Sequence, residues 1–555
     1  MTPAALAVLL RSAIRRDRVT LASWILGTAL LALFAASAVG STYGDAAERV
    51  GILRLAVDNP AILLLRGLPH GTSLPAFVFF QIFTWLALLA GLMSSFLAVR
   101  HTRAEEESGR AELVVATPAA RTTPTVAAIV HGLFANLALG AAVAVALVAG
   151  GMPVAGSLVS GCAVAAVGTA FFATGLLSAQ LARTSRGANT LGVAVVCLAF
   201  LLRGLGDALG TPSTYDGTAY DGTAYDGTAQ GAAMVSAWPS WLSPIGWGQH
   251  AFAYTDDDPR PLLLCLGLAA ACIATVLVLQ TRRDSGASLI PGRPGRAAAR
   301  PWLRSSFALG WRLHWPTLVA WCAGGAAFGM FAGGLSGVVV RAAETDPDLA
   351  ANLRTIVPSG GSVTQVLIGA MFALVGVIAA GSATQAVIRL RQEEAHGTAE
   401  LLLSTPLGRV RWFAGYLALG AVSVVLVLAS GAAASAAAIV AGGSDPQHLT
   451  DSLAAAAAQL PAALVYLAGL ALLFVLLPEA TAPLGWALLG AGVFLGVFGG
   501  LLGIPQWARD LSPFTHTPVV AGEGTDLGGA VWMLAIGAGV ASAALVLMRH
   551  RELKG

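Results

Sequence analysis

The chain alternates between long apolar runs and short polar connections. A helix needs about 20 mostly apolar residues to cross the hydrocarbon core of a bilayer. Twelve runs of this kind are present, at 19–40, 75–99, 124–149, 153–182, 188–208, 261–280, 317–340, 363–388, 412–441, 454–477, 482–503 and 529–548. The pattern predicts an all-α integral membrane protein with twelve transmembrane helices. The first run exceeds the apolar core of a signal peptide, so we expect a retained anchor.

The composition agrees with this class. Of 555 residues, 56% are hydrophobic and 11% are charged, and the mean hydropathy is +0.75. A soluble protein carries about 25% charged residues. All five cysteines lie inside predicted spans and form no CxxC pair, so neither disulfides nor a zinc site is expected.

The basic residues predict the orientation of the spans. With the N-terminus in the cytoplasm, 24 of the 32 basic residues fall on the cytoplasmic side, whereas 18 of the 29 acidic residues fall on the other side. Cytoplasmic connections are enriched in Lys and Arg. We therefore expect a multi-pass protein of the cytoplasmic (inner) membrane with both termini in the cytoplasm. The net charge of +3 gives no argument for nucleic-acid binding.

One charged phrase occurs twice, as RAEEESGRAELVVATP at 103–118 and as RQEEAHGTAELLLSTP at 391–406. A shift of 288 residues aligns them. Two further echoes support a repeat: WLSPIG at 241–246 with DLSPFT at 510–515, and TLASW with TLVAW in the first span of each half. An internal repeat predicts two parallel six-helix halves. We expect a first half at 1–280, a basic linker with an elbow helix at 281–316 and a second half at 317–555.

Each copy of the phrase predicts a short cytoplasmic helix that ends at Thr-Pro, for example Thr117-Pro118, because the residue before proline avoids the helical region. Thr102 and Glu105 could form a capping box, and Glu106 and Arg110 are four residues apart. A charged rim beside an apolar edge fits the groove of a protein partner. The alternative is a polar loop, but such loops drift freely. Here the spans have diverged and the phrase has not, which favours docking.

Smaller features complete the prediction. Amphipathic stretches at 6–16 and 303–313 suggest either elbow helices lying in the membrane interface or ordinary basic segments that flank the membrane. The tandem YDGTA repeat at 215–229 suggests a disordered surface insertion. Arg203 and Asp207, four residues apart, suggest a structural ion pair, and His131 stands alone in its span and suggests packing.

The pattern EE-x-x-G-T-x-E-L-L-L-x-T-P-x-x-R resembles the cytoplasmic coupling segment of type-2 ABC exporter permeases. The linker phrase SGASLIPGRPGRAAA and the outer phrase LSPFTHTP resemble the twelve-span actinobacterial branch called exporters of polyketide antibiotics. The resemblance covers the whole chain. It implies an amphipathic helix before the first span, a coupling helix between spans two and three, and re-entrant helices between spans five and six of each half.

The resemblance also assigns residues. It implies that the coupling segments contact ATPase subunits, or support such contacts, through Glu105, Glu106, Gly109, Glu112, Arg121, Glu393, Glu394, Gly397, Glu400 and Arg409. It implies an outer gate of re-entrant segments at Leu242, Ser243, Pro244, Leu511, Ser512, Pro513 and His516. Copy one has Arg110 where copy two has Thr398, so the two docking surfaces differ.

The energy source must lie in another polypeptide if ATP drives transport. A P-loop needs G-x-x-x-x-G-K-[ST], and the only lysine is Lys554 near the C-terminus. Two coupling segments imply two copies of a separate ABC ATPase subunit, which would bind the ATP and Mg²⁺. We expect no cofactor, catalytic residue or metal site in this chain, which is therefore a transport subunit and not an enzyme.

These observations predict the permease subunit of an ATP-driven efflux pump that exports hydrophobic small molecules such as antibiotics or drugs. One alternative is an ion-coupled twelve-span secondary drug transporter. Such coupling usually needs ionisable residues inside spans, and the acids nearest to spans, Asp207 and Glu479, lie at span ends. An ABC exporter of a lipid and a membrane scaffold or signalling permease are further alternatives.

Overall fold

The computed structural model describes residues 3–57, 60–116, 120–213, 233–282, 303, 305–345, 363–441, 447–496, 505–518 and 527–552. The chain forms two compact units, Met1–Pro294 and Gly295–Gly555. Several predicted features lie outside the described residues: the Thr117-Pro118 end of the first phrase, the YDGTA repeat, most of the linker, the end of the eleventh predicted span and Lys554.

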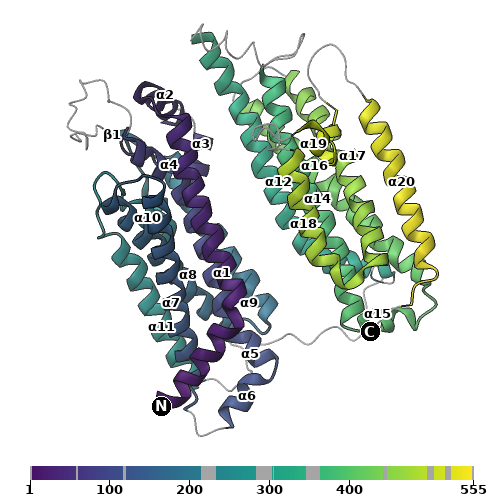
Figure 1. The fold of residues 1–555 in the computed structure, drawn as a ribbon, viewed down its shortest axis with the longest axis horizontal. Helices are drawn as coiled ribbons and strands as arrows, with labels where there is room; N and C mark the ends of the chain where they lie inside the picture. The colour runs from purple at the N-terminus through teal and green to yellow at the C-terminus, as the bar shows by residue number, and fades with distance from the viewer. Residues whose placement is uncertain are drawn as a thin grey trace. The chain divides into compact units, whose positions relative to one another are not determined.

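Long helices make up the first unit (Figure 1). They are α1 (Pro3–Thr42), α4 (Leu74–Arg100), α7 (Thr123–Ala149), α8 (Val154–Leu181), α9 (Ser185–Ala208) and α11 (Leu262–Arg282). Shorter elements connect them: α2 (Ala46–Val57), α3 (Pro60–Arg66), α5 (Arg103–Glu107), α6 (Arg110–Val115), η1 (Trp238–Leu242) and α10 (Pro244–Gln249). A two-stranded antiparallel ladder, β1 (Thr211–Ser213) with β2 (Ala233–Val235), pairs Pro212 with Met234 and departs from the all-helical expectation.

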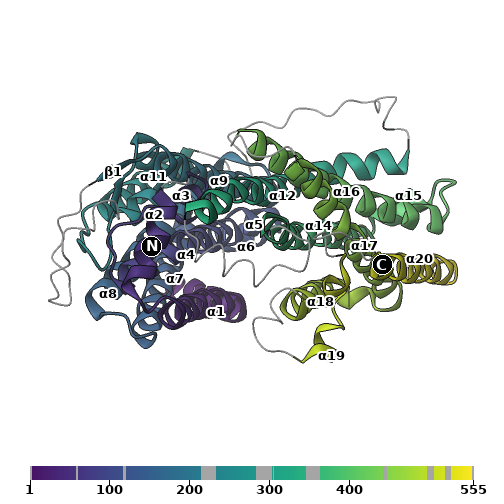
Figure 2. The same cartoon turned by 90° about the horizontal axis from the view of Figure 1, so that it is seen from above.

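The second unit repeats this style of construction. Its long helices are α12 (Ser306–Thr345), α14 (Val363–Ala395), α16 (Arg409–Ala441), α17 (Gln447–Leu476), α18 (Thr481–Gly496) and α20 (Gly528–Met548). The short elements are α15 (Thr398–Leu403), η3 (Pro478–Ala480), α19 (Gln506–Arg509) and η4 (Pro513–His516). In the end-on view of Figure 2, α18 and α19 lie next to each other at one side of this bundle.

Eleven helices in the described part of the chain are long and apolar enough to cross a membrane. The protein is therefore an all-α multi-pass membrane protein. The eleventh predicted span, 482–503, corresponds to α18, of which the described portion ends at Gly496. The count of twelve spans accordingly stays a prediction.

The second and fourth long helices form the core of each unit. In the first unit, α8 packs against α4, α7 and α11. In the second unit, α14 and α17 pack against each other and against α16. Glycines allow close approach, since a side chain at Gly329 of α12 would collide with the backbone of Gly431 in α16. Small residues at such crossings let helix backbones touch, which supplies packing energy where the hydrophobic effect is weak.

The predicted elbow helices are not separate elements. The segment 6–16 continues into the first span as one helix, α1, because no glycine or proline interrupts the chain between Arg11 and Thr20. In the second unit α12 begins at Ser306 and continues through Pro316. A proline removes one helical hydrogen bond and commonly bends a helix without ending it. The two amphipathic stretches are therefore parts of α1 and α12, and their place in the membrane interface stays a prediction.

The ends of each bundle carry different segments. In the first unit the N-terminus and the short helices α5 and α6 lie at one end, and α2, α3 and α10 lie at the other (Figure 1). In the second unit α15 and the C-terminus share one end, and α19 lies at the opposite end (Figure 1). The repeated charged phrase and the LSP phrase therefore occupy opposite ends of each bundle.

Candidate functional site

The first copy of the repeated phrase forms two short helices joined at a glycine. Helix α5 follows directly after α4, and α6 begins after Gly109, whose φ is +73°. The second copy makes the same turn at Gly397, with φ +69°, between α14 and α15. Only glycine adopts this left-handed conformation without strain. The shared glycine therefore fixes the same break in both halves, where a continuous helix was expected.

Charged pairs hold the first copy in place, but they are not the predicted ones. The guanidinium of Arg103 is buried and donates to the backbone oxygen of Ala182 (2.8 Å) and to Glu106 (2.6 Å). Glu105 accepts from Arg16 of α1 and from Arg110 (2.9 Å). Arg110 therefore pairs with Glu105, where the spacing suggested Glu106.

The predicted capping box is also absent. The hydroxyl of Thr102 donates to the backbone oxygen of Ala98, one turn earlier (2.6 Å), and makes no cap bond. A threonine that follows a helix finds this i−4 carbonyl readily. The carboxylate of Glu105 is meanwhile held by two arginines, so neither half of the box can form.

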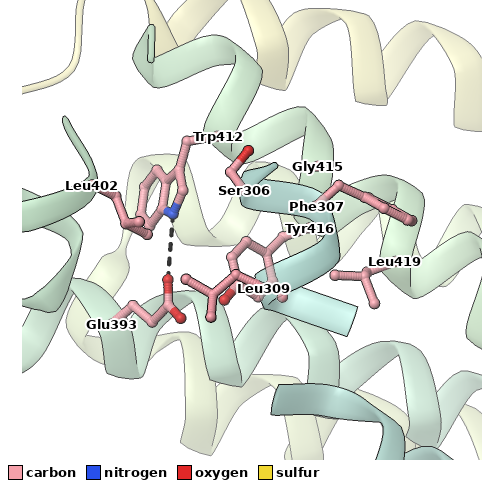
Figure 3. A pocket seen from close by; sticks show the side chains of 10 residues that line it. Ser306, Phe307, Leu309, Glu393, Leu402, Trp412, Gly415, Tyr416 and Leu419 are labelled. Atoms are coloured by element: carbon pink, nitrogen blue, oxygen red, sulfur yellow. Dashed lines mark hydrogen bonds between the residues drawn. The ribbon is translucent and has the colours of Figure 1, made fainter. Parts of the chain in front are cut away.

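In the second copy of the phrase, the first two acidic side chains are buried. Glu393 and Glu394 lie in the last turns of α14 and are 6% and 3% exposed. Figure 3 shows the carboxylate of Glu393 directed at the indole nitrogen of Trp412, at 3.4 Å, beside a small pocket that Ser306, Leu309 and Tyr416 also line. These two glutamates support the segment from inside and are not part of an exposed contact surface.

Glu394 anchors the C-terminal end of the chain. It accepts from the guanidinium of Arg551 (2.6 Å) and lies 3.4 Å from Arg391. Arg551 also sits over the ring of Phe474, 4.4 Å from its centroid, and its backbone oxygen accepts from Arg409 (2.9 Å). Arg409 therefore belongs to the group of contacts that holds Arg551 in place. Its predicted counterpart in the first unit, Arg121, lies exposed.

We expect Glu394→Ala to destabilise the second unit. Removing one partner of a buried ion pair costs about 3–5 kcal/mol, because the other charge stays buried. Thermal unfolding in detergent should therefore show a clearly lower melting temperature. The matched control is Glu400→Ala, an exposed glutamate on α15, for which a surface change within about 0.5 kcal/mol is expected. Equal melting temperatures for the two variants would contradict the assignment.

The outward face of each segment carries a leucine beside a glutamate. Leu113 is 72% exposed and Leu401 is 74% exposed, and the shift of 288 residues places one on the other. Glu112 and Glu400, also equivalent, are both exposed. In the first unit a cavity of about 370 Å³ lies beside this face, between the start of α1, the α5–α6 segment and the start of α7. Both units therefore present an exposed leucine beside an exposed glutamate at matched positions.

The serines of the two LSP phrases make equivalent hydrogen bonds. Ser243 is buried and donates to the backbone oxygen of Ala199 in α9 (2.7 Å), and Ser512 is buried and donates to that of Gly492 in α18 (2.7 Å). Each serine also caps the short helix that follows, α10 after Ser243 and η4 after Ser512, where Pro244 and Pro513 take the first helical position. Leu242, Leu511 and His516 are exposed beside them.

Arg203 and Asp207 form an ion pair of 3.0 Å in which both side chains are fully buried. Arg203 also donates to the backbone oxygens of Leu63 (3.2 Å) and Leu64 (2.7 Å) of α3. Asp207 accepts from Gln249 of α10 (3.1 Å). The pair therefore connects α9 to α3 and to the helix that follows the first LSP phrase.

His250, directly after α10, is buried in its neutral form. Its Nδ1 donates to the backbone oxygen of Gly246 (2.5 Å), its Nε2 accepts from Ser236 (2.6 Å), and its ring stacks on Trp241 at 4.3 Å. Burial lowers the pKa of His250 to about 4, which the hydrogen bond to Gly246 offsets only in part. The histidine is thus neutral in the folded protein throughout the physiological range.

This burial predicts a pH dependence of stability. The unfolded chain takes up a proton at His250 near pH 6.5 and the folded chain only near pH 4, so stability is complete above pH 6.5 and falls as the pH drops towards 4. The total loss is roughly 3 kcal/mol at most. Melting temperatures measured between pH 4 and 7 should fall more steeply for the natural protein than for His250→Gln. Parallel curves would show that the histidine does not set this dependence.

His131 is not alone. It meets Asp17 at 3.0 Å, and His101 contacts the same carboxylate oxygen. Their sequence separations of 114 and 84 residues give no local pattern, so the sequence offered no signal for this cluster.

Comparison with known proteins places the whole chain in one family. The profile of the multidrug efflux system permease Rv1217c, C-terminal domain, matches residues 303–549. The multidrug efflux system permease protein Rv1217c of Mycobacterium tuberculosis is 33% identical, over 98% of this chain and 95% of the relative. The chain belongs to the Rv1217c permease family. As an Rv1217c-family permease it is a transport component set in a membrane, and its sequence likeness extends over both units.

Proposed function

We propose that this chain is the membrane-spanning permease of an ATP-driven efflux pump that exports hydrophobic small molecules. The name of the Mycobacterium tuberculosis relative, a multidrug efflux system permease, supports drug efflux. A transport subunit with no P-loop needs an energy source elsewhere. We infer that two copies of a separate ABC ATPase bind ATP and Mg²⁺ and dock on this chain.

One observation carries the docking proposal: Leu113 and Leu401, at repeat-equivalent positions, stand exposed beside Glu112 and Glu400. Buried contacts hold both segments on their bundles: Arg103 donates to Ala182 in the first, and Glu394 accepts from Arg551 in the second. A rigidly held helix with an apolar anchor and a charged rim suits a groove in a partner. The 370 Å³ cavity beside the first segment offers space for a partner side chain.

The proposed mechanism is mechanical. Closure of the two ATPase subunits on ATP would push α5–α6 and α15. Each segment transmits force to its bundle, because only His101 and Thr102 separate α5 from α4, and only His396 and Gly397 separate α15 from α14. Coupling requires that the ATPase-bound segments favour one permease state over the other. The LSP segments at the opposite ends of the bundles would then gate the exit.

The orientation belongs to the same proposal. The predominance of Arg on one side and the shared end of the N-terminus and α5–α6 in Figure 1 support cytoplasmic termini in the inner membrane. Twelve spans in two parallel halves, 1–280 and 317–555 with a linker at 281–316, complete the proposed architecture. The buried Arg203–Asp207 pair then lies towards the outer face.

The test is purification of the tagged chain from its native membrane in a mild detergent. We expect a Walker-motif protein to co-purify with it and the preparation to hydrolyse ATP. A chain that purifies alone and without ATPase activity, while its vesicles move a dye only under a proton gradient, would instead establish a secondary transporter.

A further inference from the structure

Three side chains from three helices converge on one point in the first unit. Asp17 of α1, His101 at the C-terminal end of α4 and His131 of α7 bring one ligand atom each within 4.8 Å of one another. Asp17 and His131 are buried, and His101 is nearly so. We propose that these three side chains bind one divalent transition-metal ion, with Zn²⁺ as the ion to test.

The donor set fits such an ion. Both imidazoles present Nε2 to the same oxygen, Oδ2 of Asp17, at 3.0 Å for His131 and in direct contact for His101. The two rings lie edge to face, with centroids 5.0 Å apart and an angle of 74°. Zinc at bond lengths of about 2.0–2.1 Å spaces tetrahedral ligands by roughly 3.3 Å. Nε2 of His101 now lies closer to Oδ2 of Asp17 than this spacing, so these two atoms must move apart to admit the ion.

The surroundings position the carboxylate. Arg100 lies 2.9 Å from Oδ1 of Asp17, the oxygen not shared by the histidines, and leaves Oδ2 for the ion. Partners of this kind orient metal-binding carboxylates. The positive charge of Arg100 also weakens cation binding, so we expect an exchangeable ion. Three protein ligands leave a fourth position for water.

A metal at this point would join α1, α4 and α7 next to the α5–α6 segment, because α5 begins at Arg103, two residues after His101. The inference does not depend on ATPase docking. The shift of 288 residues places Arg389 at the position of His101, and an arginine cannot ligate a metal. The second copy therefore has no equivalent histidine at this position, and the proposed site belongs to the first unit.

Metal content measured on the full chain tests the proposal. The protein carries a tag without histidine, is freed of metal with a chelator, is dialysed against Zn²⁺ and is analysed by mass spectrometry. We expect about one more zinc per chain in the natural protein than in Asp17→Asn or His131→Gln. The matched control is His314→Gln, a buried histidine that contacts Ser423 at 3.1 Å and should keep the ion. Equal zinc in all four proteins would overturn the proposal.

A second measurement covers the case in which the variants do not fold. The natural protein is titrated with Co²⁺, which shows visible bands when its coordination is tetrahedral. Saturation at one equivalent, reversed by Zn²⁺ and accompanied by a higher melting temperature, supports the site. A titration without a saturable band would mean that Asp17 and the two histidines form a hydrogen-bonded cluster only.

Discussion

The double variant Leu113→Glu/Leu401→Glu is expected to lose its ATPase partner. Both side chains are almost fully exposed, so the substitution removes apolar surface at the proposed contact without touching a core. Truncating an interface anchor typically costs 2 kcal/mol or more, about 30-fold in affinity at each site. A buried charge opposite an apolar groove adds to that cost. Co-purification from native membranes, quantified by ATPase activity, should fall by more than about tenfold.

The chain offers a matched control for this variant. Leu242 and Leu511 are also exposed, at 57% and 71%, and also occupy equivalent places in the two halves, beside the LSP serines at the opposite ends of the bundles. Leu242→Glu/Leu511→Glu should keep the partner. Loss of the ATPase from both double variants, or from neither, would contradict the proposal that the ATPase docks on the segments that carry Leu113 and Leu401.

The second large effect is expected at Arg203. Its replacement by methionine leaves Asp207 buried without its guanidinium and leaves the backbone oxygens of Leu63 and Leu64 without a donor. Breaking a buried pair costs about 3–5 kcal/mol, and each orphaned carbonyl adds about 1–3 kcal/mol. The melting temperature in detergent should fall strongly, and α3 and α10 should become more accessible to amide exchange.

A control for Arg203 is the surface pair of Arg260 and Asp258, which lie 2.8 Å apart, with the Arg260 side chain 84% exposed. Arg260→Met should leave the melting temperature unchanged, because exposed ion pairs contribute little. A double variant, Arg203→Met/Asp207→Leu, should recover part of the loss, since no carboxylate then stays buried without a partner. A double variant as unstable as the single one would mean that the contacts of Arg203 with α3, and not its charge pair, dominate.

The sequence predicted the membrane class and the repeated phrase, and it aligned Gly109 with Gly397, but it did not predict that the helix breaks at these glycines. It also placed Arg203 and Asp207 one helical turn apart, close enough to pair. These features depend on local spacing, apolar length or internal comparison, all of which a single sequence contains.

Several of the misreadings share one physical cause. Glu393 and Glu394 look like surface acids, but Trp412 of α16 and Arg551, which follows α20, cover them. Glu105 changed partner because α1 brings Arg16 beside it. His131 gained Asp17 in the same way. Each contact depends on the packing of helices far apart in the chain, which periodicity and spacing do not specify.

ATP-driven export is tested most directly by dye transport into inverted membrane vesicles that contain this chain and its ATPase partner. A hydrophobic fluorescent dye is supplied with ATP, with a protonophore present to abolish any proton gradient. We expect ATP-dependent uptake that the protonophore does not affect and that Leu113→Glu/Leu401→Glu abolishes. Uptake that needs the proton gradient, proceeds without ATP and is unchanged in the double variant would contradict this expectation.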